Sequence, residues 1–222
     1  MISAERIPEH SPLEDESLTE YYSRMAKKYM RYPVKRVLSR IRALGIEKGL
    51  ALDVGTGPGI FPVGIARALP GMEFIAVDLS PAMAQVAKKN AAETGLAERL
   101  HVNVSSAYAL PLKDETVDLI ICLNTLHHLE DPLPLFNEVA RVLKGRGKFI
   151  IMDFRRDAPK PLAVFFNLMW RIVIREERAR DGFWNSLKAS FTLQECEKML
   201  KRSTLPPWRI YPQAIEMWIE SY

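Results

Sequence analysis

The sequence predicts an α/β fold: a mostly parallel sheet with helices on both faces and an antiparallel hairpin at its C-terminal end. Three observations lead to this prediction. Short apolar runs alternate with helical patterns from residue 51 to residue 154, which is typical of parallel strands joined by helices. The run at 117–123 is almost continuously apolar, as expected for a strand covered on both faces. Two more strand candidates follow Pro206-Pro207, where a hairpin can close the sheet.

Length and composition are those of an ordinary globular protein. The 222 residues suit one α/β domain, because such domains often reach ~250 residues. The net charge of +4 is too weak to indicate nucleic acid as a partner. Cys122 and Cys196 lie far apart and are expected to be reduced thiols of a cytoplasmic protein. No apolar stretch reaches the ~18 residues of a membrane span.

The N-terminal residues fall into two parts. Residues 1–17 are polar, acidic and contain proline, so we expect a flexible arm. From 18 to 44, apolar residues recur at spacings of three and four, which predicts helices. Pro33 is expected to divide this stretch into two helices. Residues 18–222 are predicted to form a single domain, with 18–44 as its cap helices.

Strands and helices then alternate. Strands are expected at 51–54, 74–77, 100–104, 117–123 and 148–154, and helices at 60–69, 80–95 and 131–144. Ser80 is a good N-cap because its hydroxyl can accept from a free backbone N–H, and Pro81 suits the first helical position. Gly95 ends the same helix. Each strand is therefore followed by a segment able to cover the sheet.

The C-terminal third has a different character. Residues 162–174 are apolar and aromatic, which suits a helix packed on the sheet, a gate for a lipophilic substrate or a membrane-surface contact. The segment 156–190 is accordingly a candidate substrate lid. Thr192 and Glu195 form a capping box that opens a helix to about residue 202. The final strand candidates are 208–212 and 214–219.

A glycine-rich loop between the first strand and its helix indicates a nucleotide site. Asp53 ends the strand, Gly55, Gly57 and Gly59 follow at alternate positions, and Asp78 ends the next strand. Glycines allow close backbone approach to a ligand, and an acid at the second strand's tip can accept from both ribose hydroxyls. The spacing is G-x-G-x-G rather than the G-x-G-x-x-G of dinucleotide sites. A different nucleoside ligand is therefore indicated.

The loop resembles motif I of the class I S-adenosylmethionine (SAM) dependent methyltransferases. The similarity extends to 117–132, which looks like the family's fourth strand and following segment, and to 138–153, which looks like its helix, turn and fifth strand. Residues 21–29 are similar to the N-terminal helix that covers SAM in small-molecule members. The resemblance spans roughly residues 18–155 and implies a Rossmann-like, seven-stranded sheet, a methyltransferase activity and SAM as the cofactor.

The resemblance also implies a set of cofactor contacts. Asp53 would reach the amino group of SAM, Asp78 its ribose, and Leu79 and Met83 would flank the adenine. The family commonly has an acid after the third strand, where this chain has Ser106, a weaker acceptor. The full set expected at SAM is Tyr21, Tyr29, Asp53, Gly55, Thr56, Gly57, Gly59, Asp78, Leu79, Met83, Ser106, Ala107 and Asn124.

The residues that carry the chemistry are less defined. Methyl transfer is an in-line displacement that needs alignment and water exclusion, and a base only if the acceptor loses a proton. Asp153 and His128, at strand ends, are the candidates for that base. His127 and His128 with Glu130 and Asp131 could suggest a metal, but adjacent histidines rarely face one ion, and lining or structural roles are favoured. No metal is expected.

The acceptor class follows by exclusion. After the fourth strand the chain reads Asn124-Thr-Leu-His127, unlike the proline-rich segment of DNA amino-methylating enzymes, and no aromatic-basic platform for nucleic acid is present. A small molecule remains, and a weak similarity of 183–192 to ubiquinone/menaquinone C-methyltransferases favours a lipophilic one. Alternatives are a non-catalytic SAM-binding scaffold and a protein or rRNA methyltransferase. Peripheral membrane contact and oligomeric state stay open.

Overall fold

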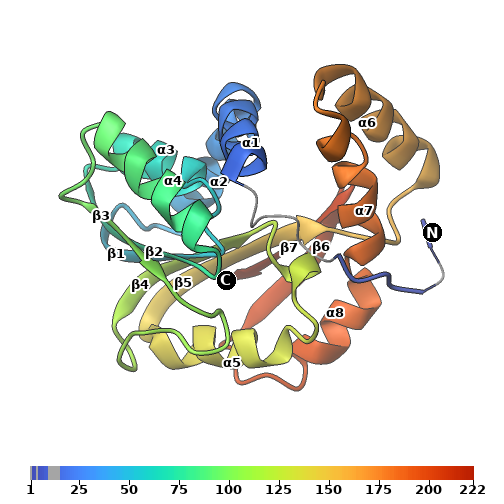
Figure 1. The fold of residues 1–222 in the computed structure, drawn as a ribbon. Coiled ribbons are helices and arrows are strands. Elements are labelled where there is room, and N and C mark those ends of the chain that lie inside the picture. Colours follow the sequence, from blue (N-terminus) through green and yellow to red (C-terminus); the bar gives the residue numbers. More distant parts are fainter. Residues whose placement is uncertain (1, 4, 10–15) are drawn as a thin grey trace.

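A computed structural model describes residues 2–3, 5–9 and 16–222. Its centre is a seven-stranded sheet in the order β3-β2-β1-β4-β5-β7-β6 (Figure 1). The first five strands in this order are parallel, and β7 runs antiparallel to both β5 and β6. The strands are β1 Lys48–Val54, β2 Gly71–Asp78, β3 Leu100–Val104, β4 Val117–Leu123, β5 Leu143–Phe154, β6 Trp208–Gln213 and β7 Glu216–Ser221.

Helices cover both faces of this sheet (Figure 1). Because side chains alternate along a strand, Ala51 of β1 packs into the layer of α2, α3 and α4, whereas Leu52 packs into the layer of α5 and α8. The helices are α1 Glu16–Tyr29, α2 Arg31–Ala43, α3 Ile60–Ala68, α4 Pro81–Glu93, α5 Leu133–Val142, α6 Lys160–Val173, α7 Gly182–Ala189 and α8 Leu193–Leu200, with short 3₁₀ turns η1 Leu126–His128 and η2 Glu177–Ala179.

The predicted seven-stranded, mostly parallel sheet with a C-terminal antiparallel hairpin is confirmed. The bounds of β3 and β4 are those expected from their apolar runs. The two helices predicted for this stretch are also present, but the chain breaks at Met30 and not at Pro33. Pro33 lies in the first turn of α2, where its missing N–H removes no helical hydrogen bond. The sequence did not predict α7.

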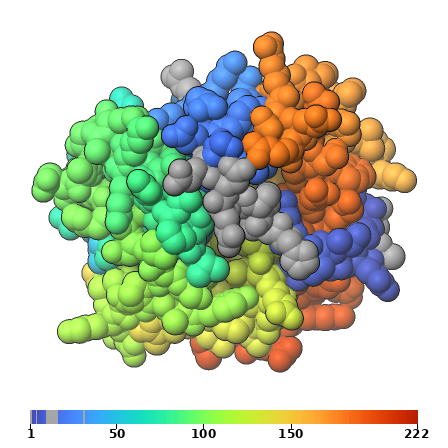
Figure 2. Space-filling view, in the orientation of Figure 1, coloured from blue at the N-terminus to red at the C-terminus, as the bar shows by residue number. Residues whose placement is uncertain are grey.

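The order of strands fixes where a ligand can bind. The chain builds outward from β1 to β2 and β3, and then returns to place β4 and β5 on the other side of β1. The helices that follow β1 and β4 therefore diverge, which leaves a crevice at the carboxyl ends of these two strands. Segments α1 and α6 lie side by side above this end (Figure 2) and share a small apolar cluster around Leu18 and Ile174.

Residues 2–3 and 5–9, which we call the N-terminal segment, contact the body of the fold. Ile2 donates its backbone N–H to the carbonyl of Arg156 at 2.9 Å. The guanidinium of Arg6 donates to the carbonyls of His127 at 3.0 Å, Leu129 at 2.5 Å and Ala189 at 2.6 Å. The segment is thereby held between η1 and the end of α7. Within the described residues, no helix is both long and apolar enough to cross a membrane.

Candidate functional site

A cavity of about 250 Å³ lies at the carboxyl ends of β1, β4 and β5. One side is formed by the glycine loop, with Asp53, Gly55, Thr56 and Gly57. The other side is formed by α1, η1, α6 and α7 and by the N-terminal segment, whose Glu9 reaches the cavity. The cavity therefore joins the predicted cofactor loop to the part of the chain proposed as a substrate lid.

The glycine loop is tied to the neighbouring strand by backbone hydrogen bonds. Gly55 and Thr56 both donate to the carbonyl of Val77, at 2.9 and 3.0 Å. Asp78 accepts from the N–H of Gly57 at 2.7 Å and from that of Ser80 at 2.9 Å. Carboxylate oxygens have further lone pairs, so Asp78 can still accept from a ligand. The loop and Asp78 act as one preformed unit.

Glycine is required in this loop for two different reasons. Gly55 has φ +71°, and a Cβ there would collide with the Thr125 side chain behind the loop. Gly57 has φ +53°, but a Cβ there would meet no protein atom within 4 Å. Because Gly57 lines the cavity, the space beside it is open to a ligand. We expect such a cradle for a bound nucleoside.

Asp53 is the buried carboxyl group of the cavity. It is 2% exposed, and the hydroxyl of Thr56 donates to it at 2.6 Å. Burial raises its pKa to about 7, against the opposing effect of the Thr56 hydrogen bond. A cationic ligand group beside Asp53 would favour its charged form. The site is therefore suited to an ammonium group.

Asn124 supplies a second polar group at the cavity. It follows β4 with a φ of +55°, a conformation that asparagine adopts more readily than most residues. Its side-chain oxygen is buried and has no hydrogen-bond partner among the described residues. Buried acceptors are rarely left without a partner. Since Asn124 lines the cavity, a ligand N–H or O–H is the partner that fits.

A histidine and a buried carboxylate form a pair at the centre of the cavity wall. The Nδ1 atom of His127 lies 2.7 Å from Asp153, and the backbone N–H of His127 donates to the other oxygen of Asp153 at 3.1 Å. Asp153 is 1% exposed. The opposite ring nitrogen of His127 lies 3.8 Å from the carboxylate of Glu9. Asp153 therefore fixes the His127 ring at Nδ1, and Glu9 lies near its other nitrogen, Nε2.

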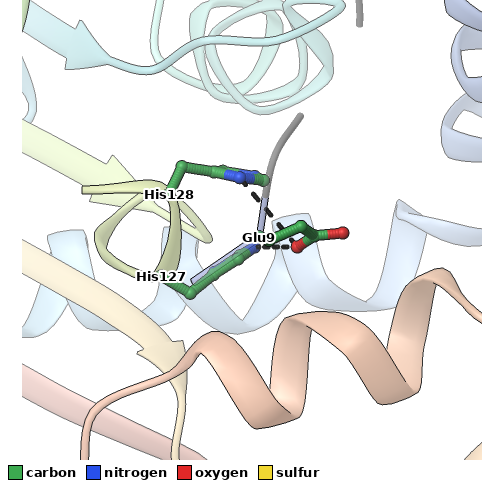
Figure 3. A group of neighbouring side chains, drawn as sticks. All are labelled: Glu9, His127 and His128. Atoms are coloured by element: carbon green, nitrogen blue, oxygen red, sulfur yellow. Dashed lines mark ion pairs between the residues drawn. The ribbon is translucent and has the colours of Figure 1, made fainter. Parts of the chain in front are cut away.

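His128 also lies in this cluster (Figure 3). Its Nδ1 atom is 4.0 Å from the same Glu9 oxygen, and its ring lies 4.1 Å from the His127 ring, centroid to centroid. Glu9 accepts from the Ser186 hydroxyl at 2.9 Å, and desolvation raises its pKa even though His127 opposes the shift. Figure 3 shows the Glu9 carboxylate directed toward both rings.

These three side chains also bear on metal binding. The ligand atoms of Glu9, His127 and His128 lie within 4.8 Å of one another. Neighbouring ligands on a tetrahedral ion held at ~2.1 Å stand only about 3.4 Å apart. The group is thus wider than a metal centre, and its members would have to move inward to hold an ion.

Aromatic rings form the remaining wall. Phe183 of α7 contacts Phe154 edge-on at a centroid distance of 5.4 Å and lies 6.2 Å from the ring of Trp170 of α6. The Phe154 ring lies 5.9 Å from His127. All of these residues line the cavity. The half of the cavity beyond the glycine loop can therefore bury an apolar molecule against aromatic rings.

The structure brings together about half of the residues that the sequence singled out. Those that line the cavity are Asp53, Gly55, Thr56, Gly57, Met83, Asn124 and His128. Asp78 does not line it but holds Gly57, and Gly59 begins α3 close to Ala87 of α4. Asp153 lies behind the wall, bonded to His127.

The others lie elsewhere in the fold. The Tyr21 hydroxyl accepts from the backbone N–H groups of Arg175 and Glu176, and Tyr29 is 42% exposed. Leu79 is 73% exposed. The Ser106 hydroxyl accepts from the Tyr108 N–H at 3.1 Å, which closes a turn. The residues outside the cavity wall are Tyr21, Tyr29, Leu79, Ser106 and Ala107.

Several cavity residues were not predicted. Tyr22 lines the cavity where Tyr21 had been expected. His127, expected only in a lining or structural role, lines the cavity together with His128, and Glu9 comes from the segment expected to be a flexible arm. One signal was available for His127, because it follows β4 and Asp153 ends β5, and these strands are neighbours. No pattern in the sequence points to Glu9.

Comparison with known proteins gives one family. A family model described as a methyltransferase domain matches residues 52–151. Malonyl-acyl-carrier-protein O-methyltransferase of Geobacter sulfurreducens is 33% identical over 159 residues, which are 72% of this chain and 57% of the relative. The ubiquinone/menaquinone biosynthesis C-methyltransferase UbiE of Pasteurella multocida is 28% identical over 140 residues, 61% of this chain and 52% of the relative.

A solved structure shares the fold over nearly the whole chain. A Methanococcus maripaludis protein described as a candidate S-adenosyl-L-methionine-dependent methyltransferase aligns with a TM-score of 0.72 at 20% identity, covering 97% of this chain and 96% of that one. By contrast, the chain spans only 52–63% of the length of the curated relatives that it matches first. The similarity to those relatives therefore concerns the shared domain.

Proposed function

The chain belongs to the class I SAM-dependent methyltransferases, with SAM as the cofactor, and from this premise we propose that it methylates a small lipophilic molecule. The observation that carries the proposal is the single cavity that the glycine loop shares with the aromatic wall of α6 and α7. A methyl donor on the loop side and an apolar acceptor on the aromatic side would meet there, with water excluded.

The residues present fit SAM. The space beside Gly57 accepts a ligand without a clash, and the buried Asn124 oxygen needs a donor. Asp53 would hold the ammonium group, and Asp78 the ribose hydroxyls. When bound, SAM supplies an electrophilic methyl group on a sulfonium. The chain's own contribution is to position both partners and keep the cavity dry.

Two features support a lipophilic acceptor. Phe154, Trp170 and Phe183 line the acceptor side of the cavity. Helix α6 exposes apolar side chains at its surface, at Val164, Phe165, Phe166, Leu168, Met169 and Ile172, which suits contact with a lipophilic substrate or a membrane surface. A relative that takes part in ubiquinone/menaquinone biosynthesis is consistent with this class. Buried, unpaired Cys122 and Cys196 agree with a reducing, cytoplasmic setting.

Calorimetric titration with SAM, S-adenosylhomocysteine and, as a control, NADH tests the cofactor. We expect binding of the two sulfur nucleosides only. Transfer of a labelled methyl group to a panel of quinols, phenols, thiols and amines then tests the acceptor. Binding without transfer to any panel member would favour a non-catalytic scaffold, and transfer to protein or rRNA alone would overturn the small-molecule proposal.

Asp78→Ala is expected to weaken SAM binding by roughly 10- to 100-fold, because a hydrogen bond to a charged group contributes about 1.5–3 kcal/mol. The variant also loses the bond to the Gly57 N–H, so loop order falls with it. Asp78→Asn keeps a side-chain oxygen that can accept a hydrogen bond, so its affinity for SAM should lie between those of the parent protein and Asp78→Ala. Calorimetry with S-adenosylhomocysteine measures the series, and unchanged affinity in Asp78→Ala would remove Asp78 from the site.

SAM binding should also strengthen as pH rises. With a pKa of about 7, Asp53 is mostly protonated at pH 6 and mostly charged at pH 7.5, and only the charged form pairs with an ammonium group. Affinity is therefore expected to increase roughly five- to tenfold over this range. Asp53→Asn removes the titrating carboxyl group of the protein, and only the ionisable groups of the ligand remain. The variant should therefore bind SAM more weakly, with an affinity that changes little with pH. Equal slopes in both proteins would contradict the assignment.

A further inference from the structure

We infer that His127, held by Asp153, is the base that takes a proton from an uncharged acceptor bearing an ionisable hydroxyl group. The inference rests on the proposed function and deepens it, because it identifies the acceptor as a molecule that gives up a hydroxyl proton. Methyl transfer needs such a base only when the nucleophile carries a proton.

Asp153 fixes the free nitrogen. His127 engages both oxygens of Asp153, since one accepts from the His127 backbone and the other lies 2.7 Å from Nδ1. The latter oxygen also accepts from the Phe154 backbone N–H at 2.6 Å. A carboxylate at that distance makes Nδ1 the protonated nitrogen of the neutral ring. The lone pair is then on Nε2. Because Asp153 is 1% exposed, water does not compete for this bond, and the ring orientation is preset.

The free nitrogen faces the acceptor side of the cavity. Its neighbour is a Glu9 oxygen at 3.8 Å (Figure 3), too far for a hydrogen bond. The Phe154 ring lies beside the imidazole, at a centroid distance of 5.9 Å. A hydroxyl on an apolar ring could therefore approach Nε2 while its ring packs on the aromatic wall. Asp153 is a positioning residue, and His127 is the group that would touch the acceptor.

His128 is not suited to the same task. Burial, aided by neighbouring His127, lowers its pKa to about 4. A group this weakly basic holds a proton poorly at neutral pH. Its Nδ1 atom is farther from Glu9 than Nε2 of His127 is, at 4.0 Å, and no carboxylate orients it from behind among the described residues. The expectation for His128 as a base therefore passes to its neighbour.

The surrounding charges select against an anionic acceptor. Three carboxyl groups lie at or behind the cavity wall, those of Glu9, Asp53 and Asp153. The guanidinium of Arg6, whose charge bears on His127, donates to the backbone carbonyls of His127, Leu129 and Ala189. A carboxylate acceptor would be desolvated among these carboxyl groups and repelled by those that are charged. A neutral phenol or enol has no such cost, and it does carry a proton to give up.

The proposed step balances. The acceptor oxygen forms a bond to the methyl carbon as the carbon–sulfur bond breaks, and the sulfur keeps that electron pair. The hydroxyl proton moves to Nε2 of His127, which leaves an imidazolium beside Asp153. Solvent takes the proton when the product departs. No oxidant, reductant or metal enters the balance.

The pH dependence has a defined direction. Groups that face His127 are Asp153 from β5, Glu9 and Arg6 from the N-terminal segment, and His128 from η1. Burial works to lower the pKa of His127, but Asp153, with help from Glu9, outweighs it, so the pKa is raised above its ordinary value. The base is neutral only above that pKa. Activity should therefore fall on the acid side at a pH above about 6.5.

The test uses 2-naphthol and 2-naphthoic acid, which share a ring system and differ in the reacting group. With labelled SAM we expect methylation of the naphthol and little of the acid. His127→Asn should lower kcat by roughly 10²- to 10⁴-fold with unchanged S-adenosylhomocysteine affinity. His101→Gln, an exposed histidine on β3, is the matched control and should behave as the parent protein.

Two further variants separate positioning from folding. Glu9→Gln should move the acid limb of the pH–rate profile to lower pH, because a negative charge facing Nε2 is lost. Asp153→Asn should move the acid limb to still lower pH and also lower kcat, since the His127 ring loses the carboxylate that orients it. A purely structural role for Asp153 would reduce the amount of folded protein without moving the limb. Thermal unfolding and S-adenosylhomocysteine affinity report folding in each variant.

Every outcome decides the inference. Preferred methylation of the acid overturns it, as does methylation of neither probe by protein that binds S-adenosylhomocysteine. Activity that is lost in a chelator and restored by a divalent cation would place an ion at Glu9, His127 and His128 and overturn the base assignment. Failure to bind SAM or S-adenosylhomocysteine at all would instead refute the proposed function.

Discussion

Replacement of Gly57 by valine is expected to abolish SAM binding in a protein that still folds. Gly57 lines the cavity, and a side chain there would enter ligand space rather than collide with the protein. Its φ of +53° adds a backbone cost, which for a residue with a Cβ is roughly 1–2 kcal/mol. We expect affinity to fall at least about 100-fold, which corresponds to about 2.8 kcal/mol.

The matched control is Gly95→Val. Gly95 has a similar φ of +70°, and a Cβ there would also meet no atom within 4 Å. It follows the end of α4, away from the cavity wall. Both variants therefore carry the same kind of backbone strain, and only Gly57→Val places a side chain in the cavity. We expect both variants to lose a comparable amount of stability, and only Gly57→Val to lose SAM binding.

Calorimetry with S-adenosylhomocysteine and thermal unfolding measure the pair. Retained affinity in Gly57→Val would refute the loop assignment. Loss of binding in both variants would show that backbone strain, and not filled space, is responsible. Gly55→Val would not serve here, because its side chain would collide with Thr125 and could disrupt the loop itself.

The fold could be predicted from the sequence because the sheet is buried on both faces. In such a sheet the strands are apolar runs whose limits are visible, and 117–123 was read correctly to the residue. The predicted strand 148–154 is longer in the structure, Leu143–Phe154, and the added residues 144–146 are exposed. Apolar patterning carries no information about such an extension.

The site was predicted in part. Strand-end reasoning located Asp53, Asn124 and Asp153 at one edge, because the carboxyl ends of parallel strands share that edge. It could not decide which of the two adjacent cavity-lining histidines is oriented by Asp153, since the 3₁₀ turn Leu126–His128 sets the direction of each ring. Nor could it place Glu9, whose position depends on the contacts of Arg6 with η1 and α7. Long-range contacts of this kind leave no periodic signal.

Arg156→Met is expected to cause a large loss of stability, because the Arg156 side chain is 1% exposed. Its guanidinium links the end of β5 to the N-terminal segment, the end of α7 and α8. It donates to the Ser190 carbonyl at 3.2 Å, to the Ser3 carbonyl at 3.0 Å and to both oxygens of Glu195 at 2.6 and 2.8 Å. Methionine fills similar volume without a donor. Buried acceptors left without a donor cost about 1–3 kcal/mol each.

We therefore expect Arg156→Met to lower the free energy of unfolding by about 3 kcal/mol and Tm by roughly 6–12 °C. Glu195 contributes the smaller share, because its side chain is 45% exposed and stays solvated. Arg171→Met is the control: its ion pair with Asp181 is exposed, and such pairs contribute about 1 kcal/mol or less. Chemical denaturation of both variants measures the difference. Equal losses would show that burial of Arg156 adds nothing to its pairing. A larger loss in Arg156→Met would show that its buried hydrogen bonds, including the one to Ser3 of the N-terminal segment, stabilise the fold.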